Sequence, residues 1–139
     1  MPTITQLKGL AELRLKEAEQ LYQQGMYDGA YYLGGYTIEF ALKARICKLL
    51  EVILYPENFQ SFKIHKLSEL VYLAGLSAEW ESKKKTNSTF QDNSDLVFAW
   101  NETLRYFPEG TKSQINTQKF LNAITDSTDG IFTWIKTKW

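Results

Sequence analysis

Apolar residues recur at helical spacing through most of the chain, and no segment alternates apolar and polar residues as a half-buried strand does. From Leu7 to Gln24, the apolar positions fall on one arc when the chain turns by about 100° per residue. Thr3 or Thr5 can cap this helix, and Gly25 ends it. The pattern predicts an all-α protein that begins with a long amphipathic helix.

The segment that follows is apolar on nearly all sides, which is typical of the central helix of a bundle. We expect a helix from about Tyr27 to Leu54, antiparallel to the first and terminated by Pro56. Each glycine inside it costs roughly 1 kcal/mol relative to alanine, which indicates the close approach of a neighbouring helix or a ligand. These glycines are Gly29, Gly34 and Gly35.

A short helix is predicted over Leu67–Leu76. The next segment, Ser77–Ser88, contains three consecutive lysines and little to bury, so we expect an exposed connection there.

Two more helices complete the predicted fold. Apolar residues over Leu96–Phe107 mark the fourth helix, with Asp92 or Ser94 as its cap. The last helix follows Asn116 and contains Gly130 as a weak point. The chain is therefore expected to form one domain over residues 1–139, an up-and-down bundle of four to five helices.

Composition narrows the functional classes. Sixteen basic and sixteen acidic residues cancel, so any nucleic-acid contact has to come from a local patch. No apolar run reaches the roughly 18 residues that a membrane span needs, and no leader signal opens the chain. Cys47 is the single cysteine, which suits a reducing compartment. We expect a cytoplasmic protein that does not enter a membrane.

Several kinds of site are excluded by residue type. One histidine and one cysteine cannot build a zinc site of the usual kind. The chain has no P-loop, dinucleotide fingerprint or nucleophile elbow. We therefore expect no metal and no cofactor.

One strip of the second predicted helix is polar. It consists of Asp28, Tyr32, Gly35, Glu39 and Lys43. Glu39 lies four residues before Lys43, the favourable order for a helical ion pair. Burying an unpaired charge is costly, so these two residues are either a structural ion pair or part of a site.

Two arginines lie near this helix or on it. Arg14 points into the apolar arc of the first helix, where a buried bridge to an acid on the second helix is the main interpretation and a ligand contact the other. Arg45 can cover apolar surface with its stem while its head reaches solvent.

Three more residues are candidates for chemistry. Asn101 and Arg105 fall one turn apart on the fourth predicted helix, where an arginine either complements the helix dipole or binds phosphate. His65 precedes a short helix, where it is either a cap or surface residue or a catalytic group.

Four short motifs resemble those of the HEPN family, the nucleotide-binding domains of higher eukaryotes and prokaryotes. The first is a G-x-Y-D-x-A turn, and the second is an E-x-x-L-K-A helix. An H-x-L and an R-Y follow in the family's order. In this chain the motifs are Gly25–Ala30, Glu39–Ala44, His65–Leu67 and Arg105–Tyr106.

The resemblance implies a helical bundle, a homodimer and a link to nucleotide or RNA binding. It also implies a minimal nucleotidyltransferase as partner, in toxin–antitoxin or defence modules. Ribonucleases of the family carry a histidine four to six residues after an arginine, whereas the residues after Arg105 up to Lys112 include none. Metal-independent RNA cleavage needs a group that moves a proton near neutral pH, so this departure favours binding over cleavage.

The leading hypothesis is a non-catalytic HEPN-type protein that binds nucleotide or RNA phosphate. Lys43 and Arg105 are expected to supply positive charge, Asn101 hydrogen bonds, and Glu39 contacts that orient the bases. One alternative is a divergent metal-independent endoribonuclease that uses Arg105 with His65. The other is a purely structural dimeric interaction module.

Overall fold

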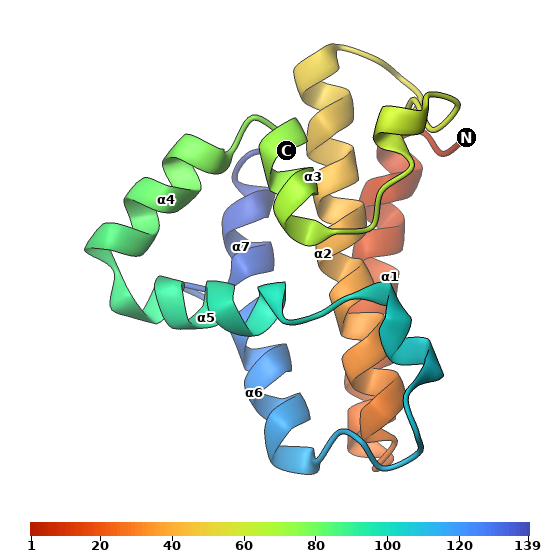
Figure 1. The fold of residues 1–139 in the computed structure, drawn as a ribbon, viewed down its shortest axis with the longest axis vertical. Helices are drawn as coiled ribbons and strands as arrows, with labels where there is room; N and C mark the ends of the chain where they lie inside the picture. Colours follow the sequence, from red (N-terminus) through yellow and green to blue (C-terminus); the bar gives the residue numbers. More distant parts are fainter.

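The computed structural model describes residues 1–139, and its regular secondary structure is helical throughout, without a β-strand (Figure 1). This confirms the all-α prediction, but the chain forms seven α-helices where four to five were expected. They are α1 (Ile4–Gln23), α2 (Tyr27–Leu50), α3 (Leu67–Leu73), α4 (Ser77–Thr86), α5 (Ser88–Phe98), α6 (Gln114–Thr125) and α7 (Ile131–Lys136), with short 3₁₀ helices η1 (Gln60–Phe62) and η2 (Glu102–Tyr106). None of them combines the length and the apolar character that crossing a bilayer requires.

The first two helices form the predicted antiparallel hairpin (Figure 1). Thr3 caps α1, because its side chain accepts the Gln6 N–H while the Gln6 side chain accepts the Thr3 N–H. Gly25 turns the chain with a φ of 76°, a left-handed conformation that glycine adopts without strain. Capping and the turn therefore follow directly from the sequence.

Helix α2 lies at the centre of the molecule, packed against α1, α3, α6 and α7. Twelve of its 24 residues are buried. The helix ends at Leu50 rather than Leu54, because Glu51 adopts a left-handed conformation with a φ of 56°. The chain then runs back beside the start of α1, where the Ile4 N–H donates to the Ile53 carbonyl.

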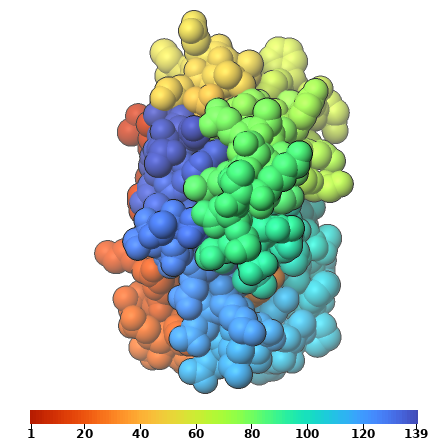
Figure 2. Space-filling view, turned by 90° about the vertical axis from the view of Figure 1, so that its left-hand side faces the viewer, coloured from red at the N-terminus to blue at the C-terminus, as the bar shows by residue number.

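The segment predicted as an exposed connection is instead helix α4, so that prediction was wrong. Trp80 anchors it, with 1% of its surface exposed. Its indole N–H donates to Ser94 Oγ at 2.7 Å, and its ring stacks on Phe98. One large aromatic residue therefore docks a helix that otherwise buries nothing. Figure 2 shows α4 and α5 against the carboxyl-terminal helices α6 and α7 on this face of the molecule.

The fourth predicted helix divides in two, which corrects its expected start and length. Asn87 caps α5 by accepting the Phe90 N–H, so neither Asp92 nor Ser94 is the cap. The α-helix ends at Phe98, and Asn101, in extended conformation, opens η2. The break places Trp100 against α2, where its indole N–H donates to the Tyr32 carbonyl.

The last predicted helix is also divided, at the weak point that Gly130 marked. Helix α6 ends at Thr125 and α7 begins at Ile131. Between them, the Asp126 carboxylate accepts the N–H groups of Thr128 and Asp129. The junction turns α7 so that Ile131, Phe132 and Ile135 enter the core.

The predicted buried bridge between Arg14 and an acid on α2 does not form. Arg14 donates instead to Glu17 of its own helix, at 2.8 Å to both carboxylate oxygens. Arg45, expected to reach solvent, donates to the carbonyls of Ala74 and Lys138. Its guanidinium therefore joins α2 to the end of α3 and to the residues after α7.

Candidate functional site

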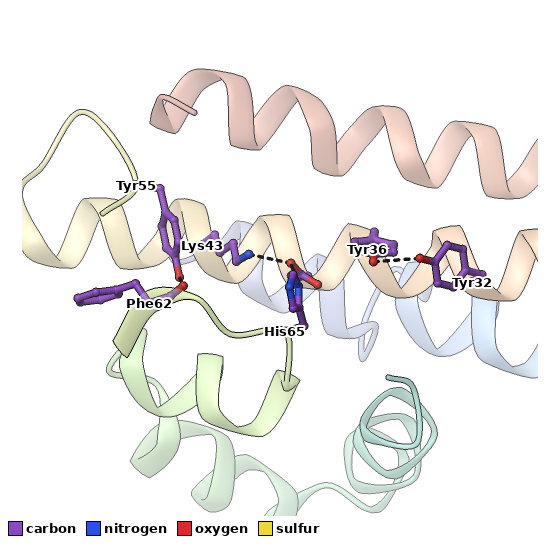
Figure 3. A network of polar contacts seen from close by, with 7 residues as sticks. Tyr32, Tyr36, Lys43, Tyr55, Phe62 and His65 are labelled. Carbon is purple, nitrogen blue, oxygen red and sulfur yellow. Dashed lines mark hydrogen bonds and ion pairs between the residues drawn. The ribbon is translucent and has the colours of Figure 1, made fainter. Parts of the chain in front are cut away.

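A cluster of three ionisable side chains lies on α2 and the segment that precedes α3 (Figure 3). Glu39 is buried, with 1% of its side chain exposed. Lys43 Nζ donates to Glu39 Oε1 at 2.7 Å, and His65 Nδ1 lies 2.9 Å from the same oxygen. The predicted pair is therefore an ion pair, and a histidine 26 residues away completes it.

The cluster fixes the histidine ring. Glu39 Oε1 accepts from both partners, while Oε2 is buried without a hydrogen-bond partner. An ionised carboxylate only accepts hydrogen bonds, so the His65 nitrogen that faces it, Nδ1, has to carry the proton. This leaves Nε2 free in a side chain that is 48% exposed. A buried acid therefore orients an accessible imidazole.

Lys43 and His65 both line one cleft, which has a volume of about 410 Å³. Lys63 adds a second lysine, and Glu57 and Asn58 add polar groups. Two aromatic and one aliphatic side chain complete the wall: Tyr55, Phe62 and Ile64. The cleft thus combines cationic groups with flat apolar surface.

Tyr55 holds the cleft together. Its hydroxyl donates to the Phe62 carbonyl at 2.9 Å, and its ring lies 5.2 Å from Lys43 Nζ (Figure 3). Its backbone N–H donates to the Pro2 carbonyl. Burial, and then the negative charge of Glu39, raise the pKa of Tyr55 above its ordinary value, so the hydroxyl stays a neutral donor.

The polar strip continues along α2 beyond the cleft. The Tyr32 and Tyr36 hydroxyls are 3.1 Å apart (Figure 3), and burial raises the pKa of Tyr36. Gly35 leaves room for the Trp100 ring, because any Cβ at this position would overlap the indole. Asp28 accepts the backbone N–H groups of Gly110 and Lys112. At this end the strip therefore holds the fold together.

Asn101 and Arg105 do not line the cleft. Asn101 is the cap of η2 and accepts the Thr103 N–H at 3.0 Å. Arg105 is exposed on η2, where it donates to the Tyr106 hydroxyl at 3.2 Å and lies over that ring. They also do not share an α-helical face, because the helix ends before Trp100. The predicted binding residues thus fall into two separate places.

The sequence did not single out the loop residues of the cleft: Tyr55, Glu57, Asn58, Phe62, Lys63 and Ile64. Irregular segments have no periodicity that would assign their side chains to a face. In the sequence, only the close spacing of aromatic, basic and histidine residues before α3 indicated that this segment could line a site.

Nowhere do three or more histidine, cysteine, aspartate or glutamate side chains gather as a metal site. Comparison of the chain with family models, with curated proteins and with solved structures gives no match. The class that can be stated is therefore that of an all-α protein with a polar cleft beside a buried acid.

Proposed function

We propose that the protein binds a phosphate-bearing ligand, a nucleotide or a segment of RNA, in the cleft beside Lys43 and His65. The observation that carries this proposal is the placement of two lysines and one histidine around a single cleft with aromatic walls. Ammonium groups attract phosphate oxygens, and aromatic rings offer surface on which bases stack. The resemblance to the HEPN family supports the same class of ligand.

The residues take different roles from those expected. Lys63 supplies the unpaired positive charge, and the Lys43 ammonium, paired with Glu39, offers its remaining N–H groups. Phe62 offers apolar surface to a base. Glu39 is buried beneath Lys43 and His65, so we assign it the orientation of these two side chains rather than contact with the base. Arg105 reaches only a ligand that extends along α2, and Asn101 serves its helix cap.

Two lysines of one segment provide a matched test. Lys63 lines the cleft, whereas Lys66, three residues later, is 71% exposed and does not. We expect Lys63→Ala to weaken binding of AMP and of a short RNA by about two- to fivefold, the worth of one exposed ion pair. Lys66→Ala should leave the affinity unchanged. Calorimetric titration of both variants checks this.

Two results would count against the proposal. One is the absence of binding by the wild-type protein at millimolar AMP, GMP or RNA. The other is equal loss of affinity in the Lys63 and Lys66 variants, which would indicate general charge attraction instead of a site.

A second candidate function, RNA cleavage, is favoured by the contact between Glu39 and His65. With Nδ1 bound to Glu39, His65 Nε2 can accept the proton of a ribose 2′-hydroxyl. The 2′-oxygen then bonds to phosphorus, the bond from phosphorus to the 5′-oxygen breaks, and the leaving oxygen takes a proton from solvent. Arg105 does not line this cleft, so we leave it out of the step.

An RNA strand and the same strand in 2′-deoxy form separate cleavage from binding. A ribonuclease should cut only the first, and His65→Ala should abolish the cut. Equal cleavage by wild type and variant would remove His65 from the mechanism.

We also propose, from the family resemblance, a HEPN-like homodimer that acts with a nucleotidyltransferase in a toxin–antitoxin or defence module. Exposed apolar side chains gather where α2 ends, which suits a protein contact: Leu49, Leu50, Val52, Ile53 and Leu54. Sedimentation measures the assembly state, and co-purification with a neighbouring nucleotidyltransferase tests the partner. If no phosphate ligand binds, a purely structural module is the remaining alternative.

A further inference from the structure

The electrostatic balance of the cleft depends on His65. Glu39 neutralises Lys43 at 2.7 Å, and Glu57 pairs with the Met1 ammonium at 3.7 Å. Glu69 of α3 and Lys66 also form an ion pair, so their charges cancel. Tyr55 is neutral, because burial raises its pKa. Lys63 is then the one uncompensated positive charge that faces the cleft while His65 is neutral.

The hydrogen bonds of His65 decide what it can offer a ligand. In the neutral ring, the single proton sits on Nδ1, which faces Glu39 Oε1 at 2.9 Å. Nε2, in a side chain that lines the cleft, then carries a lone pair, and a lone pair repels a phosphate oxygen. Protonation turns Nε2 into a donor and adds a second uncompensated positive charge. Glu39 remains the acceptor for Nδ1 in both states.

Histidine is the side chain whose charge ordinarily changes between about pH 5 and pH 8. Lys43 cannot take over this role, because its ammonium is already bound to Glu39 and only 12% of its side chain is exposed. The neutral form of His65 therefore disfavours an anion in the cleft, and the charged form favours it.

We propose that binding of a phosphate group in this cleft is coupled to the uptake of one proton by His65 at Nε2. The proposal rests on the proposed function and adds its regulation. Glu39 is a positioning residue here, since it acts on the ligand only through His65. The affinity of the cleft thus falls as the pH rises and His65 loses its second proton.

A deoxydinucleotide with one phosphodiester is a suitable probe. Its phosphate keeps a single charge between about pH 5 and pH 8, and it has no 2′-hydroxyl that the protein could use for cleavage. Calorimetric titration in two buffers of different ionisation enthalpy counts the protons that binding takes up. As the pH rises, we expect uptake to approach one proton and the affinity to fall by up to about tenfold per pH unit. Toward acid pH, where the free protein already carries the proton, the affinity should level off.

Two substitutions of His65 separate its nitrogens. His65→Asn keeps an amide near the Nδ1 position, and His65→Gln places one near the Nε2 position. Both should bind without proton uptake and without pH dependence. The glutamine variant should bind more tightly than the asparagine variant at every pH, because its N–H can donate to the phosphate. His65 is half-exposed, so both variants should fold.

The outcomes are distinguishable. Wild-type binding with constant affinity and no proton uptake would overturn the coupling and leave the proposed function intact. Proton uptake that persists in His65→Asn would assign the coupling to another group and also overturn it. If the wild type binds no dinucleotide, AMP or RNA at any pH, the proposed function fails and the coupling fails with it.

Discussion

Glu39 determines the character of the cleft although it is not part of the cleft wall. A carboxylate buried to 99% needs partners, and Lys43 and His65 supply them through one oxygen. The carboxylate in return fixes the ammonium and the imidazole at the edge of the cleft. A charge that would destabilise the interior alone is here the reason that two mobile side chains have defined positions.

At the residue scale, Tyr55→Phe tests how the cleft segment is held. The substitution removes the hydroxyl that donates to the Phe62 carbonyl and keeps the ring beside Lys43. We expect a loss of about 1 kcal/mol in the free energy of unfolding, measured with urea. Tyr72→Phe is the control, because 74% of Tyr72 is exposed and its hydroxyl should contribute within about 0.5 kcal/mol. Equal values for both variants would contradict the role given to Tyr55.

The site was predictable where helical spacing determines which residues meet. Glu39 and Lys43 are four residues apart, and the structure confirms their pairing. The contact with His65 was not predictable, since it joins residues 26 positions apart through an irregular segment. Asn101 and Arg105 were predicted to share one helix face. The α-helix ends at Phe98 instead, and Trp100 packs against Gly35.

At the scale of elements, replacing a glycine by alanine should have opposite effects on stability in the first two helices. A Cβ at Gly35 would overlap the Trp100 indole, whereas a Cβ at Gly9 of α1 meets nothing within 4 Å. Gly35→Ala should destabilise the protein by about 2 kcal/mol or more. Gly9→Ala should stabilise it by up to about 1 kcal/mol, because alanine is the better helix former. Urea unfolding of the pair measures both signs, and stabilisation by Gly35→Ala would refute the packing.

The stability of the junction between α6 and α7 should depend on pH through Asp126. The N–H groups of Asp129 and Thr128 donate to Asp126 and hold the pKa of its carboxyl below the ordinary value. A lowered folded-state pKa stabilises the fold above the unfolded value of about 3.9. That contribution is lost as the pH falls through the folded value. Asp126→Asn should therefore flatten the acid limb of the unfolding curve.

The control for the pH experiment is Asp92→Asn, which changes an exposed aspartate of α5. It removes the same charge without touching the junction. An identical effect of both variants on the acid limb would indicate that net charge, and not the hydrogen bonds of Asp126, governs it.

At the scale of the whole molecule, one helix organises the fold. Periodicity predicted α1, α2 and α3 to within a few residues, because their apolar arcs are long or their boundaries carry capping signals. It missed α4, since a single buried tryptophan gives no period. The break between α5 and η2 depended on the contact of Trp100 with α2, which no local pattern contains. The break between α6 and α7, in contrast, lies where Gly130 marked a weak point in the sequence.

Asp28 links parts of the molecule that are far apart in sequence. Its two oxygens accept the N–H groups of Gly110 and Lys112 at 2.7 Å, and so fasten the segment between η2 and α6 to the start of α2. Asp28→Asn turns an amide toward one of these donors. We expect a loss of about 1–3 kcal/mol and faster hydrogen exchange at both amides. Unchanged exchange would show that the segment is held by other contacts.

The central position of α2 also determines which amino-acid substitutions the protein can tolerate. In a helix that faces solvent on one side, the positions that accept substitutions recur with the helical period, and we expect this of α1. Helix α2 is surrounded by neighbours from Ala30 to Cys47, so successive positions face one partner or another. Tolerance to substitution should therefore be low at nearly every position of α2, without a helical period. Substitutions should be accepted more readily in the shorter helices around it.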